Sequence, residues 1–161
     1  MNIVLIGMPG SGKTTIGTEI AKLMGRKFID VDSIIPELAG MSIAEIFARH
    51  GESTFRKYER EQTLKASQNV DVVIATGGGM VKDRRNYYPL HETGYICQIY
   101  RDISLLPTEG RPLSQANNLE TMYAQRKHMY EFFRDCIVIN DRTPIEAAQD
   151  VIMNFKTFCN C

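Results

Sequence analysis

The sequence predicts an α/β protein built in three layers, with a five-stranded parallel sheet between helices. Three observations predict this class: a phosphate-binding pattern stands between a strand-like and a helical run, the strand-like runs are apolar throughout, and helical patterns alternate with them. Strands that are apolar along their whole length are typical of parallel sheets covered on both faces. The 161 residues are enough for one domain with a sizeable core, so we treat 1–161 as a single domain.

The predicted elements follow one another along the chain without repeats or low-complexity linkers. Strand-like runs lie at residues 2–6, 27–31, 70–75, 95–100 and 136–140, and helical patterns lie at about 13–24, 42–49, 52–68, 119–134 and 144–156. Ser42 with Glu45 predicts a capping box, and Thr143-Pro144 with Glu146 predicts the start of the last helix. Ligands of parallel sheets bind beyond the carboxyl ends of the strands, so the residues that follow each strand matter most.

The first strand is followed by a complete phosphate-binding loop. Residues 7–14 read Gly-Met-Pro-Gly-Ser-Gly-Lys-Thr and match the pattern G-x-x-x-x-G-K-[ST]. In such a loop the backbone N–H groups point at a phosphate chain, and the following helix aims its positive dipole end at the same anion. Lys13 can reach the β- and γ-phosphates, and the Thr14 hydroxyl can ligate Mg²⁺. The loop therefore predicts that the protein binds a nucleoside triphosphate, but it does not indicate which reaction follows.

The second strand ends in two acidic residues, Asp30 and Asp32. Strand alternation points both carboxylates to one side and Val31 to the other. Beside a triphosphate, one acid is suited to holding Mg²⁺, directly or through water, and the other to accepting a proton from an attacking hydroxyl. The alternative is a pair of helix N-caps or solvated loop residues.

Three further groups carry candidate chemistry. Residues 77–79 are all glycine, which lets a ligand approach the backbone closely, although a flexible turn has the same composition. Glu59 stands three residues after Arg56 and can fix its guanidinium, although an exposed salt bridge has the same spacing. Arg126 falls inside the apolar stripe of the helix at 119–134 and needs an anionic partner, either a ligand or an internal carboxylate.

Several classes of protein are excluded by what the sequence lacks. The third strand has no terminal Asp of the kind found in motor and transporter ATPases, and there is no N-K-x-D guanine-reading motif, which favours a small phosphotransferase. Basic and acidic residues both number 19, so no basic field favours nucleic acid. No apolar run is long enough to span a membrane.

The sequence has four cysteines, and their spacing does not suit a metal site: Cys97, Cys136, Cys159 and Cys161. We expect all four to be free thiols in a cytoplasmic protein, and Cys97 and Cys136 to be buried. A monomer is expected because no apolar face is left unexplained.

The combination of these motifs resembles the shikimate kinase family from Met1 to about Ile152. The resemblance is carried by the phosphate loop, Asp30-Val31-Asp32, Phe55-Arg56-Lys57-Tyr58-Glu59, Gly77-Gly78-Gly79, Arg111-Pro112-Leu113 and Arg126-Lys127-His128-Met129-Tyr130. It implies the nucleoside-monophosphate-kinase type of P-loop NTPase fold. It also implies transfer of the γ-phosphoryl group of ATP to the 3-hydroxyl of shikimate, a step of chorismate and aromatic amino-acid biosynthesis, with Mg²⁺ as cofactor.

The same resemblance implies a role for each site residue. Asp32 would bind the shikimate hydroxyls and activate the nucleophile, while Asp30 would serve Mg²⁺ with Thr14. Arg56 and Arg126 would grip the shikimate carboxylate, Glu59 would orient Arg56, and the backbone of Gly77, Gly78 and Gly79 would bind the ring. ATP would be held by Gly10, Ser11, Gly12, Lys13, Thr14 and Thr15, by Arg111 from a mobile lid, and by Arg142 and Pro144 beside the adenine. Lys13 and Arg111 would join Asp32 as catalytic residues.

The resemblance divides the domain into a core of 1–32, 70–100 and 119–161, a shikimate-binding helical segment at about 33–65, and a short lid at about 104–118. The segment Arg101–Gly110 is much shorter than the usual family segment, and the helix and arginine that normally precede the lid are missing. Two alternatives stay open at this point. One is a related kinase acting on gluconate or a nucleotide, and the other is a non-catalytic nucleotide-binding protein with the kinase fold.

Overall fold

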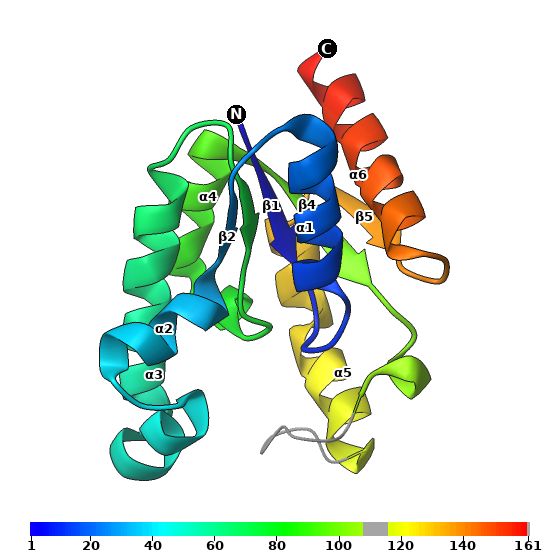
Figure 1. The fold of residues 1–161 in the computed structure, drawn as a ribbon. Helices are drawn as coiled ribbons and strands as arrows, with labels where there is room; N and C mark the ends of the chain where they lie inside the picture. The colour runs from blue at the N-terminus through cyan, green and yellow to red at the C-terminus, as the bar shows by residue number, and fades with distance from the viewer. Residues whose placement is uncertain (108–115, 161) are drawn as a thin grey trace.

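The computed structural model describes residues 1–107 and 116–160 and shows five parallel strands in a single sheet (Figure 1). The strands are β1 (Asn2–Ile6), β2 (Phe28–Asp30), β3 (Val73–Ala75), β4 (Gly94–Tyr100) and β5 (Cys136–Ile139). Their order across the sheet is β2-β3-β1-β4-β5, and every neighbouring pair is parallel. The predicted fold class and all five predicted strands are therefore confirmed.

Helices cover both faces of the sheet and make the three layers. They are α1 (Lys13–Met24), α2 (Val31–Ala39), α3 (Ile43–Ser67), α4 (Tyr87–Thr93), α5 (Ala116–Phe133) and α6 (Pro144–Cys159). Along β1, Ile3 and Leu5 pack into a core with α1 and α6, whereas Val4 and Ile6 pack into a second core with α2 to α5. All of β1 is buried because alternate side chains enter different cores, which explains its unbroken apolar run. None of the described helices is long and apolar enough to cross a membrane.

The two helix caps predicted from the sequence are both present in the structure. The Ser42 hydroxyl accepts from the Glu45 amide while the Glu45 carboxylate accepts from the Ser42 amide, and Thr143 and Glu146 form the same reciprocal cap on α6. The two helices expected at 42–49 and 52–68 are the halves of α3, which is interrupted at Gly51 with φ 80° and ψ 170°. Glycine tolerates this left-handed region, so the chain can kink there.

Two helices were not predicted, and one of them corrects the reading of the acidic pair. β2 ends at Asp30, and α2 begins at Val31, so Asp32 lies in the first turn of a helix and the argument from strand alternation is wrong. Asp30 is the N-cap of α2, where its Oδ1 atom accepts from the Asp32 amide at 3.1 Å. α2 has nine residues with Pro36 inside it, which hides its helical pattern. The second missed helix, α4, has only seven residues.

The cysteines confirm the sequence-based expectation only in part. Cys97, Cys136 and Cys159 are free, and Cys97 is fully buried as expected. Cys136, on the edge strand β5, is only half-buried, which corrects the expectation that both strand cysteines are enclosed. Cys161 lies outside the described residues.

Candidate active site

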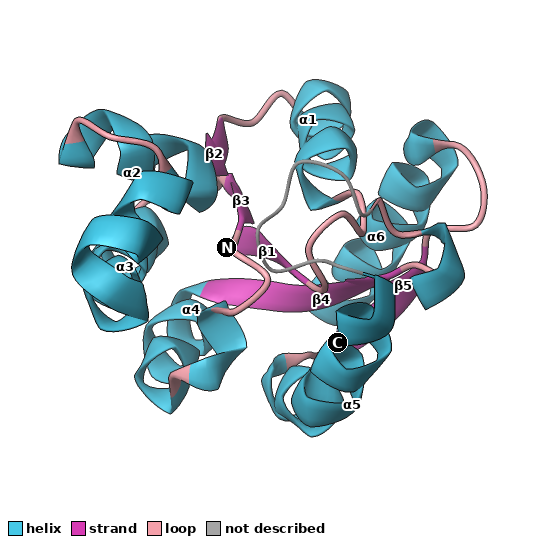
Figure 2. Cartoon of the chain, turned by 90° about the horizontal axis from the view of Figure 1, so that it is seen from below, coloured by secondary structure: helices cyan, strands magenta, loops and turns pink. Residues whose placement is uncertain are grey.

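A cleft of about 690 Å³ opens beyond the carboxyl ends of the strands, and Figure 2 looks onto this end of the sheet. The helices α2 and α3 stand on one side of it and α5 on the other. Of the predicted site residues, the cleft is lined by Gly10, Gly12, Lys13, Thr14, Thr15, Asp30, Asp32, Arg56, Glu59, Gly78, Gly79 and Arg126. The fold therefore gathers in one place residues that are scattered over more than a hundred positions of the sequence.

The phosphate loop at 7–14 has the backbone that its glycines predict. Gly7, Gly10 and Gly12 all have positive φ, at 146°, 79° and 101°. A Cβ atom on Gly7 would come within 2.3 Å of the Ile99 carbonyl, so only glycine fits this approach to β4. The Lys13 ammonium donates to the carbonyls of Gly7 at 3.0 Å and Met8 at 2.9 Å. The lysine therefore curls over the loop in which a phosphate chain would lie.

Asn140, which the sequence did not single out, braces the phosphate loop from the end of β5. Its side-chain amide donates to the Ser11 carbonyl at 2.8 Å, and its backbone amide donates to the Tyr100 carbonyl at 2.7 Å. A Cβ atom on Gly12 would lie 2.5 Å from the same amide nitrogen. Asn140 thereby ties the ends of β4 and β5 to the loop, through a contact that spans 129 positions of the sequence.

The two acidic residues of the β2–α2 junction face different neighbours. The Thr14 hydroxyl donates to Oδ2 of Asp30 at 2.7 Å, which places that carboxylate beside the phosphate loop. Asp32 points toward the glycine turn, where a Cβ atom on Gly77 would lie 2.6 Å from its Oδ1 atom. Asp30 is thus an N-cap that also lines the cleft, so its capping role does not conflict with the proposed role in binding an ion.

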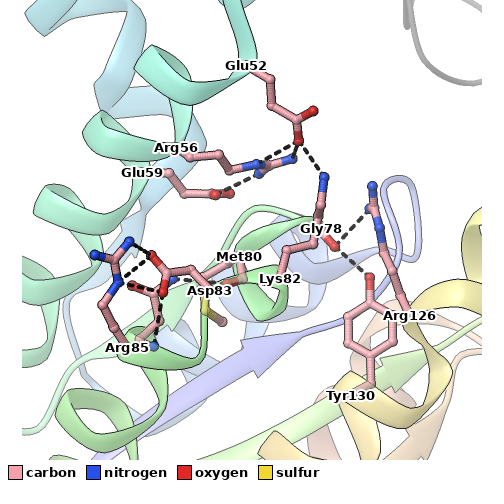
Figure 3. Close-up of polar contacts among 11 residues, drawn as sticks. Glu52, Arg56, Glu59, Gly78, Met80, Lys82, Asp83, Arg85, Arg126 and Tyr130 are labelled. Carbon is pink, nitrogen blue, oxygen red and sulfur yellow. Dashed lines mark hydrogen bonds and ion pairs between the residues drawn. The ribbon is translucent and has the colours of Figure 1, made fainter.

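Arg56 is held by two carboxylates at once (Figure 3). Its Nη1 atom donates to Oε2 of Glu59 at 2.6 Å, and its Nε and Nη2 atoms both donate to Oε1 of Glu52 at 3.1 Å. Lys82 donates to the same Glu52 oxygen at 2.5 Å. Glu52 and Lys82 are exposed, but Glu59 is only 1% exposed. The exposed salt bridge considered from the sequence for Arg56 and Glu59 is therefore wrong, because this pair is buried, and the pairing with Glu52 was not predicted.

Burial changes the acidity of Glu59. Loss of solvent raises the pKa of Glu59 from 4.5 to about 6, and the nearby Asp32 carboxylate adds to the rise. The Arg56 guanidinium opposes it but does not cancel it. The carboxylate that holds the Arg56 guanidinium therefore changes its protonation state near pH 6.

The three glycines make room for charged side chains. A Cβ atom on Gly77 would lie 2.3 Å from Oε1 of Glu59, and one on Gly79 would lie 2.3 Å from Nη2 of Arg56. A Cβ atom on Gly78 would strike the ring of Pro9 in the phosphate loop at 2.5 Å. The triplet is thus required by close packing within the site itself, a reason that the sequence alone does not give.

Arg126 and Tyr130 approach the glycine turn from α5. Arg126 donates from Nη1 to the Gly78 carbonyl at 3.0 Å, and the Tyr130 hydroxyl donates to the same oxygen at 2.6 Å. Arg126 is half-buried and makes no ion pair with a carboxylate in the described part of the chain. Of the two partners expected for it, an internal carboxylate in direct ion-pair contact is not found among residues 1–107 and 116–160, although Arg126 acts on the Glu59 carboxylate from farther away.

Some predicted residues lie elsewhere, and one charged residue of the cleft was missed. Arg142 pairs with Asp141, Glu146 and Asp150 in the loop before α6 and on that helix, and neither Arg142 nor Pro144 lines the cleft. Arg111 and most of the predicted lid lie outside the described residues. Arg101, the residue that follows β4, does line the cleft. Its place directly after a strand was the signal that could have identified it.

A phosphate loop, an acidic pair and two arginines in one cleft of this fold define a P-loop kinase that acts on a small molecule. The chain belongs to the shikimate kinase family, whose sequence profile matches residues 9–156. It is 40% identical to the shikimate kinase of Caldanaerobacter subterraneus subsp. tengcongensis, over 94% of each chain. It is 41% identical to that of Helicobacter hepaticus, over 94% of this chain and 93% of the relative.

Solved structures agree with this assignment. The shikimate kinase from Acinetobacter baumannii in complex with shikimate superposes with a TM-score of 0.91 at 28% identity, covering 97% of this chain and 93% of that one. The shikimate kinase from Aquifex aeolicus gives a TM-score of 0.88 at 27% identity, covering 99% and 98%. A gluconokinase from Sinorhizobium meliloti, at 16% identity and a TM-score of 0.62, shares the fold.

Proposed function

We propose that this protein transfers the γ-phosphoryl group of ATP to the 3-hydroxyl of shikimate, as a cytoplasmic monomer. The observation that carries the proposal is the meeting of Arg56 and Arg126 at the glycine turn, in the same cleft as the phosphate loop and beside Asp32. Two guanidinium groups suit one small carboxylate, because charge-assisted hydrogen bonds from both sides fix its orientation. The family membership and the shikimate-bound relative support the same substrate.

The residues beside the phosphate loop fit a magnesium ion. Mg²⁺ in kinases keeps several waters and takes only one or two protein oxygens together with substrate phosphates. The Thr14 hydroxyl and the Asp30 carboxylate, 2.7 Å apart, supply oxygens of this kind next to the loop. We assign these two residues to the ion, which when bound neutralises charge on the transferred phosphoryl group.

Asp32 is the proposed group that receives the proton of the attacking hydroxyl. It lies in the same cleft as Lys13 and Thr14 but on the side of the glycine turn, next to Glu59 and Gly77. A hydroxyl held there by the arginines and the turn would face both this carboxylate and the phosphate loop. Holding acceptor and phosphoryl donor in line is most of what phosphoryl transfer requires.

The direct test is release of ADP from Mg·ATP with and without shikimate, using gluconate and AMP as matched controls. Strong stimulation by shikimate alone is the expected result, and it would also show that the short segment after β4 supports turnover. Stimulation by gluconate or AMP instead would favour the related-kinase alternative. Intact ATP binding with no stimulation by any of the three would favour a non-catalytic protein.

A further inference from the structure

The carbonyl of Gly78 accepts two hydrogen bonds from one helix (Figure 3). The Tyr130 hydroxyl donates to it at 2.6 Å and Nη1 of Arg126 donates to it at 3.0 Å. The two donors are four residues apart on α5, so they occupy one face of that helix. These hydrogen bonds join positions 52 and 48 residues apart in sequence and connect α5 to the glycine turn.

The two donors differ in what else they can reach. Tyr130 has no exposed surface and packs with Met80 and Phe133 in the core, and it does not line the cleft. Arg126 is half-buried and lines the cleft. Burial raises the pKa of Tyr130 to about 12, so its hydroxyl keeps the proton that it donates. Tyr130 is thus a fixed anchor, while Arg126 keeps part of its guanidinium for a ligand.

The hydrogen bond from Tyr130 determines the orientation of the peptide group between Gly78 and Gly79. The Gly78 carbonyl and the Gly79 N–H belong to one planar trans peptide, in which they point in opposite directions. A carbonyl turned toward α5 therefore turns the Gly79 N–H away from α5. With no side chain at either position, the triplet itself has little to resist rotation of this peptide, so an external hydrogen bond is needed to fix it.

We propose that Tyr130 is a positioning residue for the phosphoryl acceptor. Its hydroxyl fixes the Gly78–Gly79 peptide and, by sharing the Gly78 carbonyl, holds Arg126 at the mouth of the acceptor site. Tyr130 acts only through these neighbours, since it does not reach the cleft. The inference rests on the proposed function, because it takes Arg126 and the glycine turn as the shikimate side of the site.

The test is Tyr130→Phe, which removes one hydroxyl and keeps the ring that fills the core. Loss of one buried hydrogen bond predicts a roughly three- to tenfold rise in the KM and the Kd for shikimate, with little change in the KM for ATP. Tyr95→Phe is the matched control. Tyr95 is also a buried tyrosine, but it lies in the core on the other face of the sheet. It is expected to alter thermal stability alone.

A double-mutant cycle separates positioning from mere stability. Because both donors share one acceptor, Tyr130→Phe and Arg126→Ala are expected to raise the shikimate Kd less together than the product of their separate effects. Additive effects, or equal rises in the KM for shikimate and ATP, would overturn the inference. Wild-type protein that binds no shikimate in calorimetry would overturn the proposed function. Normal binding by wild type with Tyr130→Phe unchanged would overturn only the role of Tyr130.

Discussion

Nη1 of Arg56 lies 2.6 Å from Oε2 of Glu59, on a carboxylate that is almost completely buried. The pair is three residues apart on α3 and sits against the glycine turn, where Gly77 and Gly79 leave space for both charges. A buried ion pair depends strongly on both partners, because removal of one leaves the other charge uncompensated. The orientation of Arg56 is therefore tied to the ionisation of Glu59.

This coupling predicts that shikimate binding weakens in acid. The pKa of Glu59 is raised to about 6, so the carboxylate gains a proton and loses its ion pair as the pH falls through that value. We expect the KM for shikimate to rise below about pH 6, measured in a series of buffers at saturating ATP. Glu59→Gln should have a high KM at every pH and lack this inflection. Glu61→Gln, an exposed neighbour on α3, should keep it.

Stability is expected to change in the opposite direction. Because the pKa of Glu59 in the folded protein lies above its ordinary value of 4.5, the proton favours the folded state. The contribution of Glu59 to the free energy of unfolding is complete below pH 4.5 and is lost as the pH rises through about 6. Denaturation of wild type and Glu59→Gln across this range measures it, and parallel curves for the two proteins would contradict the assignment.

Gly79→Ala should weaken shikimate binding without straining the backbone. Gly79 has φ −103°, which alanine adopts readily, but the new Cβ atom would lie 2.3 to 2.6 Å from the Arg56 guanidinium. Displacement of Arg56 predicts a rise in the KM for shikimate of roughly tenfold or more, since small misplacements in a site cost up to about 10²-fold. Gly78→Ala strikes Pro9 of the phosphate loop instead, so the KM for ATP should rise as well. Identical kinetics for the two variants would refute this reading.

Asp32→Asn should remove most of the turnover while leaving ATP binding nearly intact. The substitution keeps the shape of the side chain but removes the group that is proposed to take the proton, and general bases contribute roughly 10²- to 10⁴-fold. Steady-state kcat and calorimetric ATP binding separate the two effects. Near-normal kcat in Asp32→Asn would show that another group, or none, activates the hydroxyl.

The sequence predicted the parts of the site that depend on local pattern. The phosphate loop and the five strands are each encoded within a few consecutive residues, and Gly51 marks the kink in α3 where two helices were expected. The position of Asp32 was predicted for the wrong reason, because the strand ends at Asp30 and the helix already begins at Val31, before Asp32 is reached. A carboxylate can reach the cleft from the first turn of a helix as well as from a strand.

The contacts that hold the site together were missed because they join distant positions. Asn140 with Ser11, and Tyr130 with Gly78, are separated by 129 and 52 residues. Glu52 acquires its role only when α3 packs beside Lys82, 30 residues away. The three glycines were expected to admit a ligand, but the need for Gly77 and Gly79 to accommodate Glu59 and Arg56 becomes visible only in the folded chain.

Asp30→Asn should raise the Mg²⁺ concentration that the enzyme needs for activity, without unfolding α2. Asparagine caps helices as well as aspartate does, so the cap on α2 is kept while the charge beside Thr14 is lost. We expect the Mg²⁺ concentration for half-maximal activity to increase roughly 10- to 100-fold, with kcat largely recovered at high Mg²⁺. Asp32→Asn is the natural comparison, since excess Mg²⁺ should not rescue it. An unchanged Mg²⁺ titration in Asp30→Asn would remove Asp30 from the proposed ion site.

Arg101 stands directly after β4, in the segment that the sequence comparison with the family suggests is short. It follows Tyr100, whose carbonyl accepts from Asn140, and the Asn140 side chain holds Ser11 of the phosphate loop. Arg101 lines the cleft, is half-buried, and makes no ion pair with a described carboxylate. A partly desolvated guanidinium needs an anion, and we propose that the phosphates of ATP are that anion.

Arg101→Ala is therefore expected to raise the KM for ATP by roughly tenfold or more, the range of a lost charged hydrogen bond, with the KM for shikimate little changed. Lys127→Ala is the charge-matched control, since Lys127 is exposed on α5 and does not line the cleft. Equal effects of the two substitutions would mean that only overall charge matters. A selective rise in the KM for shikimate would instead place Arg101 with Arg56 and Arg126 on the acceptor side.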